Sequence, residues 1–284
     1  MAQTSNNNVL GLIAGQGRLP FIIAEGAKKA GKRVVCAALD GNASPELADV
    51  CDEFSYVPLA KMGRWIRFLK SGGAQETIMV GRVAKKRLQN ASIPRLIAAY
   101  MPDWRTLRTY FWRLRGKTMQ NDTLLSAIAD ELSSGGIILT DSTKYSKDQL
   151  ADKGVMTKTQ PSRTVGQDIE FGWEIVKKIG ELDIGQSVAV KDKDVIAVEA
   201  IEGTARMISR AGRLCKKGKW TLLKAPRSSH DMRFDVPCVG PDTIRSLHEH
   251  AAAALVVEAD NTFIIDKQET LALADKLKIA VIGH

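Results

Sequence analysis

Short apolar runs and amphipathic segments alternate along the first half of the chain. The run that begins at Val9, VLGLIAG, predicts a buried strand, and its closing glycine predicts a turn. The next segment, QGRLPFIIAEGAKKAG, is typical of a helix, because Pro20 suits a first turn and Gly31 a C-terminal stop. A second apolar run, RVVCAALD, ends at Asp40. Strand, helix and strand in this order predict a βαβ unit.

The same rhythm continues through the rest of this half. Strands are expected in EFSYVPL, ETIMVGRV and GGIILTDS, and helices at residues 64–70 and 104–115. A further helix is expected in NDTLLSAIADEL, where Asn121 or Asp122 suits the N-cap and Leu124 belongs to the buried face. Strands that alternate with helices favour an open, mainly parallel sheet of the Rossmann-like kind.

The pattern changes after this alternation and indicates an α/β protein of two domains. Residues 1–145 are the predicted Rossmann-like domain, and residues 146–164 are polar and are interpreted as a linker. Residues 165–284 are expected to form a C-terminal mixed α/β domain. It begins with an amphipathic helix, followed by two strands around a turn at Lys191–Asp194 and a strand in TLLKAP.

The end of the chain is expected to complete this second domain. The alanine-rich segment from Pro241 to Ala254 predicts a helix. The segment LVVEADNTFIID predicts a hairpin that turns at Asp260 and Asn261. A last helix and the strand IAVIG would close the domain.

Composition and charge narrow the class of protein. The chain has 284 residues, 44% of them apolar, which is enough for two buried cores. Its net charge of +9 predicts an anionic partner, such as a phosphorylated metabolite, nucleic acid or an anionic membrane surface. The sequence has neither a membrane-spanning apolar run nor a secretory signal, so we expect a cytoplasmic protein. The four cysteines lack CxxC spacing and are expected to be reduced.

A loop rich in charged and turn-forming residues is expected from Lys224 to Thr243. Asp231, Arg233 and Asp235 alternate there, so an extended backbone would place them on one face. Two carboxylates suit Mg²⁺, and the planar guanidinium matches a phosphate. The competing interpretation is a polar edge whose charges pair in solvent.

A second acidic group follows the strand VIAVEA. Glu199 and Glu202 come where this strand ends, and Gly203 and Thr204 then begin a helix. Carboxylates at a strand end beside a helix N-terminus suit a metal and phosphate site. A pair of solvated carboxylates at the edge of the sheet is equally compatible with this pattern.

Glycine turns are the third candidate. Ligands bind open α/β sheets beyond the carboxyl ends of the strands, so Gly15, Gly17, Asp40 and the turn at Gly81–Arg82 should converge. Gly15 and Gly17 followed by Asp40 also indicate a dinucleotide site, and an NAD(P)-dependent oxidoreductase is the alternative function. That pattern is incomplete, because Pro20 stands where its third glycine belongs.

Aromatic and basic residues interleave in WRTLRTYFWRLR, residues 104–115. Nucleic-acid binding is one interpretation, but no recognised binding module accompanies the stretch. The commoner interpretation is an amphipathic helix with an apolar face from Leu107 to Leu114, beside an active site or on a membrane surface. We therefore expect no nucleic-acid partner.

Several motifs resemble one family in the same order along nearly the whole chain. GLIAGQGRLP, LDIGQSVAV with VIAVEAIEGT, and LLKAP with DMRFDVPCVGPDTI are similar to the LpxI-type UDP-2,3-diacylglucosamine pyrophosphatases. The resemblance implies a hydrolase of lipid A biosynthesis that cuts UDP-2,3-diacylglucosamine into lipid X and UMP. It also implies an N-terminal Rossmann-like domain, an unusual C-terminal domain, and a requirement for a divalent cation, Mg²⁺ or Mn²⁺.

The resemblance places the family's essential aspartate on Asp235. Its neighbour in the motif falls on Asp231, although His230 replaces a glutamine. Two acids of the family pattern are missing here, at Ala205 and in the Gln120–Asn121 pair. The candidate catalytic residues are Asp235, Asp231, Arg233 and Lys224, and the candidate metal ligands are Asp235, Asp231, Glu199 and Glu202.

The remaining expectations concern substrate and partners. The partner is expected to be UDP-2,3-diacylglucosamine, with peripheral contact at the inner membrane surface and a homodimer both compatible with the pattern. Replacing Asp235 by alanine should abolish turnover but preserve substrate binding. The candidate substrate-binding residues are Gly15, Gly17, Arg18, Gly81, Arg82, Asp122 and Thr204.

Overall fold

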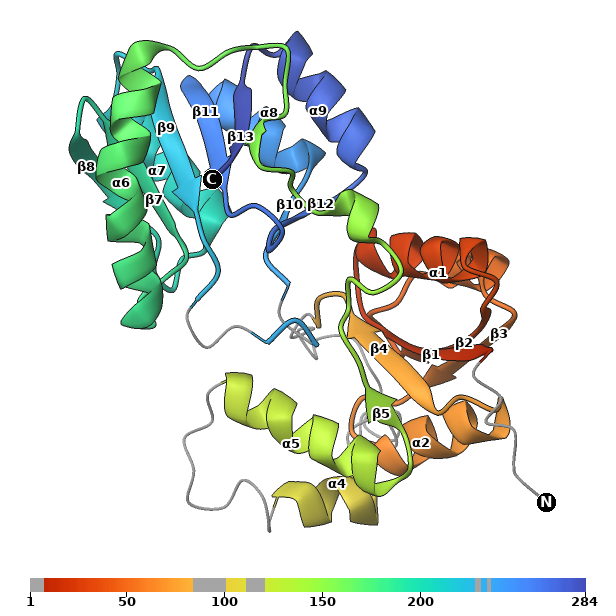
Figure 1. Cartoon of the computed structure of the whole chain (residues 1–284). Coiled ribbons are helices and arrows are strands. Elements are labelled where there is room, and N and C mark those ends of the chain that lie inside the picture. Colours follow the sequence, from red (N-terminus) through yellow and green to blue (C-terminus); the bar gives the residue numbers. More distant parts are fainter. Residues whose placement is uncertain (1–7, 84–100, 111–120, 228–230, 234–235) are drawn as a thin grey trace. The chain divides into compact units, whose positions relative to one another are not determined.

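The computed structural model describes residues 8–83, 101–110, 121–227, 231–233 and 236–284, with the backbone alone for residues 121 and 122. The chain divides into two compact units. The first comprises the chain up to Ser146 together with Met232 and Arg233, and the second comprises Lys147–Asp231 and the C-terminal part to His284. Each unit contains its own sheet (Figure 1).

The first unit contains a parallel five-stranded sheet, in the order β3-β2-β1-β4-β5. The central strand is buried along its whole length, because helices cover both faces of the sheet. This arrangement confirms the predicted Rossmann-like sheet. Its strands are β1 (Val9–Ala14), β2 (Arg33–Leu39), β3 (Glu53–Val57), β4 (Glu76–Val80) and β5 (Ile138–Leu139).

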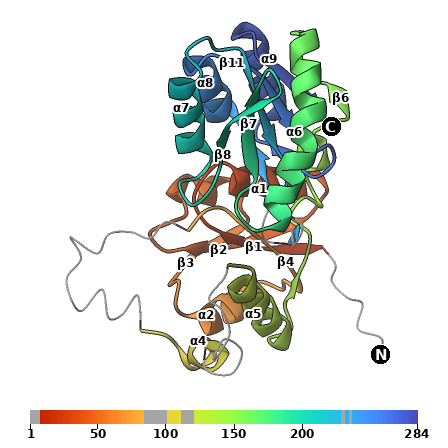
Figure 2. The same ribbon diagram turned by 90° about the vertical axis from the view of Figure 1, so that its left-hand side faces the viewer.

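Helix α1 (Leu19–Lys29) covers one face, and α2 (Met62–Ser71) and α5 (Asn121–Ser134) cover the other (Figure 2). A short helix, α4 (Trp104–Thr109), packs beside α2 and α5. A 3₁₀ turn, η1 (Pro45–Val50), precedes β3. Pro20 lies in the first turn of α1, as predicted. Gly31 has a positive φ and follows the C-cap of α1, which agrees with its predicted role as the helix stop.

The second unit contains a mixed six-stranded sheet, in the order β6-β13-β11-β9-β7-β8. Strands β13, β11 and β9 run parallel, whereas β7 is antiparallel to both its neighbours, so β8 runs in the same direction as β9. The strands are β6 (Gly154–Val155), β7 (Ser187–Lys191), β8 (Asp194–Val198), β9 (Trp220–Lys224), β11 (Ala252–Val257) and β13 (Ala280–Gly283).

Helices again cover both faces of this sheet. The long helix α6 (Arg163–Glu181) covers one face, while α7 (Thr204–Leu214), α8 (Pro241–Glu249) and α9 (Lys267–Lys276) cover the other (Figure 1). The mixed α/β prediction is therefore confirmed. A short 3₁₀ turn, η3 (Lys147–Gln149), begins the unit.

The strand pair β7–β8 forms by the predicted local mechanism. Asp192 and Lys193 both have positive φ, 53° and 61°, which suits a two-residue hairpin whose twist matches the strands.

The stretch that was interpreted as a linker includes β6, which pairs antiparallel with β13.

Three local predictions are wrong. The alanines after residue 251 belong to β11 rather than to a helix, because this strand lies between two parallel neighbours and is mostly buried. No hairpin turns at Asp260, because β12 (Phe263–Ile264) pairs instead with β10 (Cys238–Val239). Leu124 is exposed, because α5 turns its alanines and Leu132 inward.

No helix in the described part of the chain is both long and apolar enough to cross a membrane. The four cysteines are free, as expected, and Cys36 is buried in β2.

Candidate active site

Two buried charged side chains lie at the carboxyl edge of the second sheet. Glu199 follows β8, and Lys224 ends β9. Ala197 and Leu222 belong to the core that packs against α7, and the two charged residues follow them at two-residue spacing. Their side chains therefore extend to the α7 face of the sheet. Each is only 5% exposed.

A hydroxyl group at the start of α7 joins the two charges. Thr204 donates from Oγ1 to Oε1 of Glu199 at 3.0 Å. The ammonium of Lys224 donates to the same hydroxyl at 3.3 Å. The result is a directed chain from Lys224 through Thr204 to Glu199, in which each hydrogen bond polarises the next.

Glu199 has acceptor capacity that its own unit does not use. Its second oxygen, Oε2, is buried and has no hydrogen-bond partner among the described residues. A buried acceptor without a partner costs about 1–3 kcal/mol, and more when the group is charged. Such an oxygen is placed to receive a cation or a donor that the described chain does not supply.

Ser187 adds a second buried polar atom at this edge. It lies opposite Lys224 in the β7–β9 register, so both side chains share one face. Its carbonyl accepts from the amide of Glu199 at 2.9 Å. Its Oγ is also buried and without a partner in the described part of the chain. Sequence analysis missed this residue, because a serine at the start of a strand carries no distinguishing pattern.

Gly185 explains why the backbone approaches so closely here. A Cβ at this position would lie 2.0 Å from the carbonyl oxygen of Glu199, so only glycine fits. The next residue, Gln186, accepts from the amide of Ala225 at 3.0 Å. The segment from Gly185 to Ser187 thus holds the ends of β8 and β9 together.

Glu202 does not join this network. Its Oε1 accepts from Arg210, and its Oε2 accepts from the amide of Ala200 at 3.1 Å. The hydrogen bond from its own backbone amide and the Arg210 guanidinium hold the pKa of Glu202 below its usual range. The solvated, paired interpretation therefore fits Glu202, whereas the site interpretation fits Glu199.

The acidic loop is described only in part. Asp231 is half-buried, and Met232 and Arg233 form a turn, so the extended, alternating arrangement was wrong for these residues. Ser142 fixes the turn, because its amide donates to the carbonyl of Met232 at 3.0 Å and its Oγ to that of Arg233 at 2.9 Å. Asp235 lies outside the described residues.

Among the described residues, Glu199 is the predicted metal ligand with a buried oxygen that has no hydrogen-bond partner. The orphaned oxygen of Glu199 is a hard donor of the kind that Mg²⁺ or Mn²⁺ prefers. Glu202 does not fit, since both its oxygens have partners. The described residues include no group of three or more side chains that could hold a metal ion.

The glycine turns of the first unit converge as predicted. Gly15 follows β1 and Gly81 follows β4, and these two neighbouring strands lead to opposite sides of the sheet. A Cβ on Gly15 would lie 2.7 Å from the carbonyl oxygen of Arg82. The two turns form a bridge in which Gln16 and Arg82 exchange backbone hydrogen bonds of 2.8 and 3.0 Å.

This bridge limits what the glycine turn can bind. The amides of Gly15 and Gln16 donate to the β4 side, so they do not cradle a phosphate. Gly17 has a φ of +107° and open space where a side chain would be. The start of α1, not the whole turn, is therefore the part that can face a ligand.

Other predicted residues of the first unit lie outside this bridge. Arg18 forms an exposed ion pair with Glu25 at 3.1 Å and lies over the ring of Phe21. Asp40 is exposed just beyond β2. Asp122 belongs to α5, and its side chain lies outside the description.

The aromatic and basic stretch has a structural partner. Arg105 and Arg108 both donate to Glu131 of α5, at 2.9 and 3.0 Å, and the carboxylate of Glu131 is fully buried. Asp103 caps α4 and accepts from Gly63 at 2.7 Å. These arginines therefore hold α4 on α5, which argues against the nucleic-acid interpretation. Residues 111–115 lie outside the described part.

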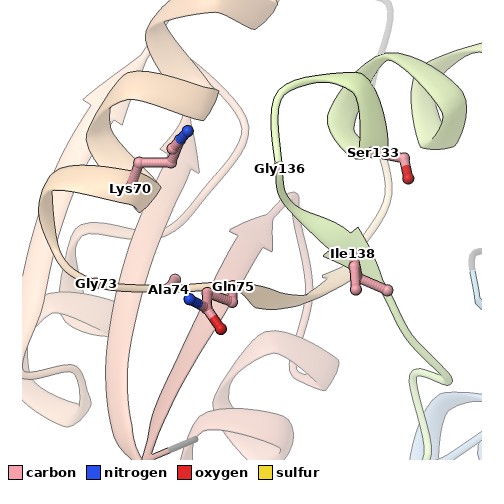
Figure 3. A pocket seen from close by; sticks show the side chains of 7 residues that line it. All are labelled: Lys70, Gly73, Ala74, Gln75, Ser133, Gly136 and Ile138. Carbon is pink, nitrogen blue, oxygen red and sulfur yellow. The ribbon is translucent and has the colours of Figure 1, made fainter. Parts of the chain in front are cut away.

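A pocket of about 500 Å³ lies elsewhere in the first unit (Figure 3). Lys70, Ser133 and Ile138 are among the residues that line it. It is at the amino ends of β4 and β5, opposite the glycine turns. Ligands of open parallel sheets bind at the other edge, so we do not assign this pocket to the candidate site.

Comparison with known proteins covers both units. The model of the LpxI N-terminal domain matches residues 9–149, and that of the LpxI C-terminal domain matches residues 152–282. The chain is 28% identical over 283 residues to the UDP-2,3-diacylglucosamine pyrophosphatase LpxI of Caulobacter vibrioides, with 96% of each chain covered.

Proposed function

The chain belongs to the LpxI family, and we propose that it hydrolyses the pyrophosphate bond of UDP-2,3-diacylglucosamine to lipid X and UMP in lipid A biosynthesis. The observation that carries the proposal is the orphaned oxygen of Glu199 beside the buried Lys224 and the hydroxyl of Thr204 that joins them. A fixed positive charge suits a phosphate, and an unsatisfied carboxylate beside it suits a cation that would bind the same phosphate.

Lys224 is the residue that would stabilise charge. Hydrolysis places negative charge on the phosphate oxygens and on the departing phosphate, and a fixed ammonium in a buried site stabilises it more than solvent would. Thr204 holds this ammonium in place through its hydroxyl. The amides at the start of α7 add partial positive charge on the same side of the site.

Glu199 is the described carboxylate that would hold the divalent cation that we propose. A bound Mg²⁺ or Mn²⁺ supplies Lewis acidity toward phosphate oxygens. We propose that Asp231 and Asp235 complete the ligand set and that Glu202 does not take part. Ser187 is positioned to accept or donate one further hydrogen bond at the buried end of the site.

We propose that the start of α1 in the first unit binds a nucleotide. Gly17, Arg18 and the start of α1 lie at the point where neighbouring strands lead to opposite faces, which is where open α/β sheets bind nucleotides. We assign Asp122 to the same role on the family resemblance alone. The NAD(P)-dependent alternative gains nothing from the comparisons, which match LpxI domains throughout.

The location of the enzyme follows from this substrate. Two acyl chains retain the lipid at a membrane, so we propose a cytoplasmic enzyme that meets it at the inner membrane surface, attracted by its net charge of +9. A homodimer is compatible with the proposal and is tested by the mass of the protein in solution.

One experiment tests the activity. The purified protein is incubated with UDP-2,3-diacylglucosamine and Mg²⁺ or Mn²⁺ in ¹⁸O-labelled water. We expect UMP and lipid X, label in one of them, and loss of turnover with EDTA or in Asp235→Ala. Absence of UMP release with either metal would overturn the proposal, as would normal turnover by Asp235→Ala.

A further inference from the structure

Three aliphatic side chains are exposed at the carboxyl edge of the second sheet. Ile201 is fully exposed, at 104%, Leu182 at 70% and Ile184 at 47%. Isolated exposed aliphatic residues are ordinary on protein surfaces. Exposed aliphatic residues that gather next to a polar site are more informative, because such patches mark the surfaces that bind apolar groups.

The backbone brings the two turns that carry these residues together. Leu182 and Ile184 lie in the turn between α6 and β7, where Ile184 donates to the carbonyl of Ile179 at 3.1 Å. Gly185 follows and lies directly against the carbonyl of Glu199. Ile201 comes two residues after Glu199. The turns that carry Leu182, Ile184 and Ile201, called the patch below, therefore meet beside the backbone of Glu199.

Charges around the patch distinguish between two apolar partners. Glu181 is exposed, and Asp183, between the two aliphatic residues of the first turn, is more than half exposed. Asp183 pairs with Arg227 at 2.7 Å, so the turn brings no excess of positive charge. An anionic membrane surface attracts basic segments and disfavours acidic ones. An uncharged hydrocarbon chain has no such preference.

We propose that Leu182, Ile184 and Ile201 form a subsite for an acyl chain of the substrate, while its phosphates lie at Lys224 and Glu199. This inference rests on the proposed function and extends it to the lipid part of the substrate. It places the acyl contact in the second unit, at the end of β8, rather than on the face from Leu107 to Leu114.

The test compares chain lengths. Ile201→Ser and Leu182→Ser are made in the Asp235→Ala background, so that binding is measured without hydrolysis. Leu214→Ser is the matched control, because Leu214 is 61% exposed at the far end of α7 and outside the patch. Dissociation constants are measured by equilibrium dialysis for UDP-2,3-diacylglucosamine with tetradecanoyl chains and with butanoyl chains.

We expect each patch variant to weaken tetradecanoyl binding about fivefold, because each methylene removed from water contributes about fourfold. Butanoyl binding, and both substrates in Leu214→Ser, should stay within about twofold. An unchanged chain-length preference in the patch variants would overturn the subsite. So would loss of binding to anionic vesicles with the preference intact, because the patch would then contact the membrane. If the wild-type protein releases no UMP but the patch variants still lose the preference for long chains, the acyl subsite is supported and the proposed activity is refuted.

Discussion

Replacing Thr204 by valine tests the directed chain at its centre. Valine has nearly the same shape as threonine but lacks the hydroxyl that accepts from Lys224 and donates to Glu199. The substitution therefore removes one hydrogen bond from each of two buried charged groups without opening a cavity. Thr204→Ser is the matched control, because serine keeps the hydroxyl at the same helix position.

The magnitude follows from the two bonds. A hydrogen bond to a charged group contributes about 1.5–3 kcal/mol, and water replaces part of it because Thr204 is only half-buried. We expect Thr204→Val to lower the free energy of unfolding by about 2 kcal/mol. We also expect kcat/KM to fall at least about tenfold, since the Lys224 ammonium loses its fixed position.

Two assays separate these effects. Urea unfolding gives the stability change as a shift in midpoint at constant slope. Release of UMP from UDP-2,3-diacylglucosamine gives the kinetic change, and the serine control should keep both values near those of the wild type. If Thr204→Val lost less than about 0.5 kcal/mol and kept normal turnover, the hydroxyl would not organise the site.

Two further substitutions test the packing that supports each unit. Gly185→Ala should push the Glu199 backbone away and lower kcat/KM by about tenfold or more, because the new Cβ would lie 2.0 Å from a carbonyl oxygen. Gly166→Ala in α6 is its control, since open space surrounds that position, and equal kinetics for the two variants would refute the argument. Glu131→Gln should lower the free energy of unfolding by about 2 kcal/mol, because two arginines donate to this buried carboxylate. An unchanged urea midpoint would show that the ion pairs of Arg105 and Arg108 with Glu131 contribute nothing to holding α4 on α5.

The first unit could be predicted because its signals are local. Pro20 and Gly31 set the limits of α1. The apolar runs before and after this helix are typical of parallel strands that helices cover on both faces. Once the strands are parallel, the turns at Gly15 and Gly81 must meet at one edge. The bridge between Gln16 and Arg82 could not be foreseen, because it depends on how close two backbones approach.

The second unit was harder because long-range pairing decides its elements. Alanine favours helices, yet Ala252 and Ala254 belong to β11, where neighbouring strands on both sides supply the hydrogen bonds. The expected hairpin after β11 failed for the same reason, since Phe263 pairs with Cys238 rather than with its sequence neighbours.

In the candidate site, too, long-range contacts decide what the local sequence leaves open. Glu199 and Glu202 look alike in the sequence, three residues apart before a helix. The alternation of β8 buries Glu199, while Arg210, two turns along α7, pairs with Glu202. Only the register of β7 on β9 reveals Ser187.

The comparison of these two glutamates tests the central claim most directly. Single-turnover release of UMP from saturating UDP-2,3-diacylglucosamine is measured for Glu199→Gln and Glu202→Gln. We predict that Glu199→Gln slows release by about a hundredfold or more, while Glu202→Gln stays within about threefold of the wild type. Equal rates for the two variants, or a greater loss in Glu202→Gln, would contradict the assignment of the reaction to the buried carboxylate beside Lys224.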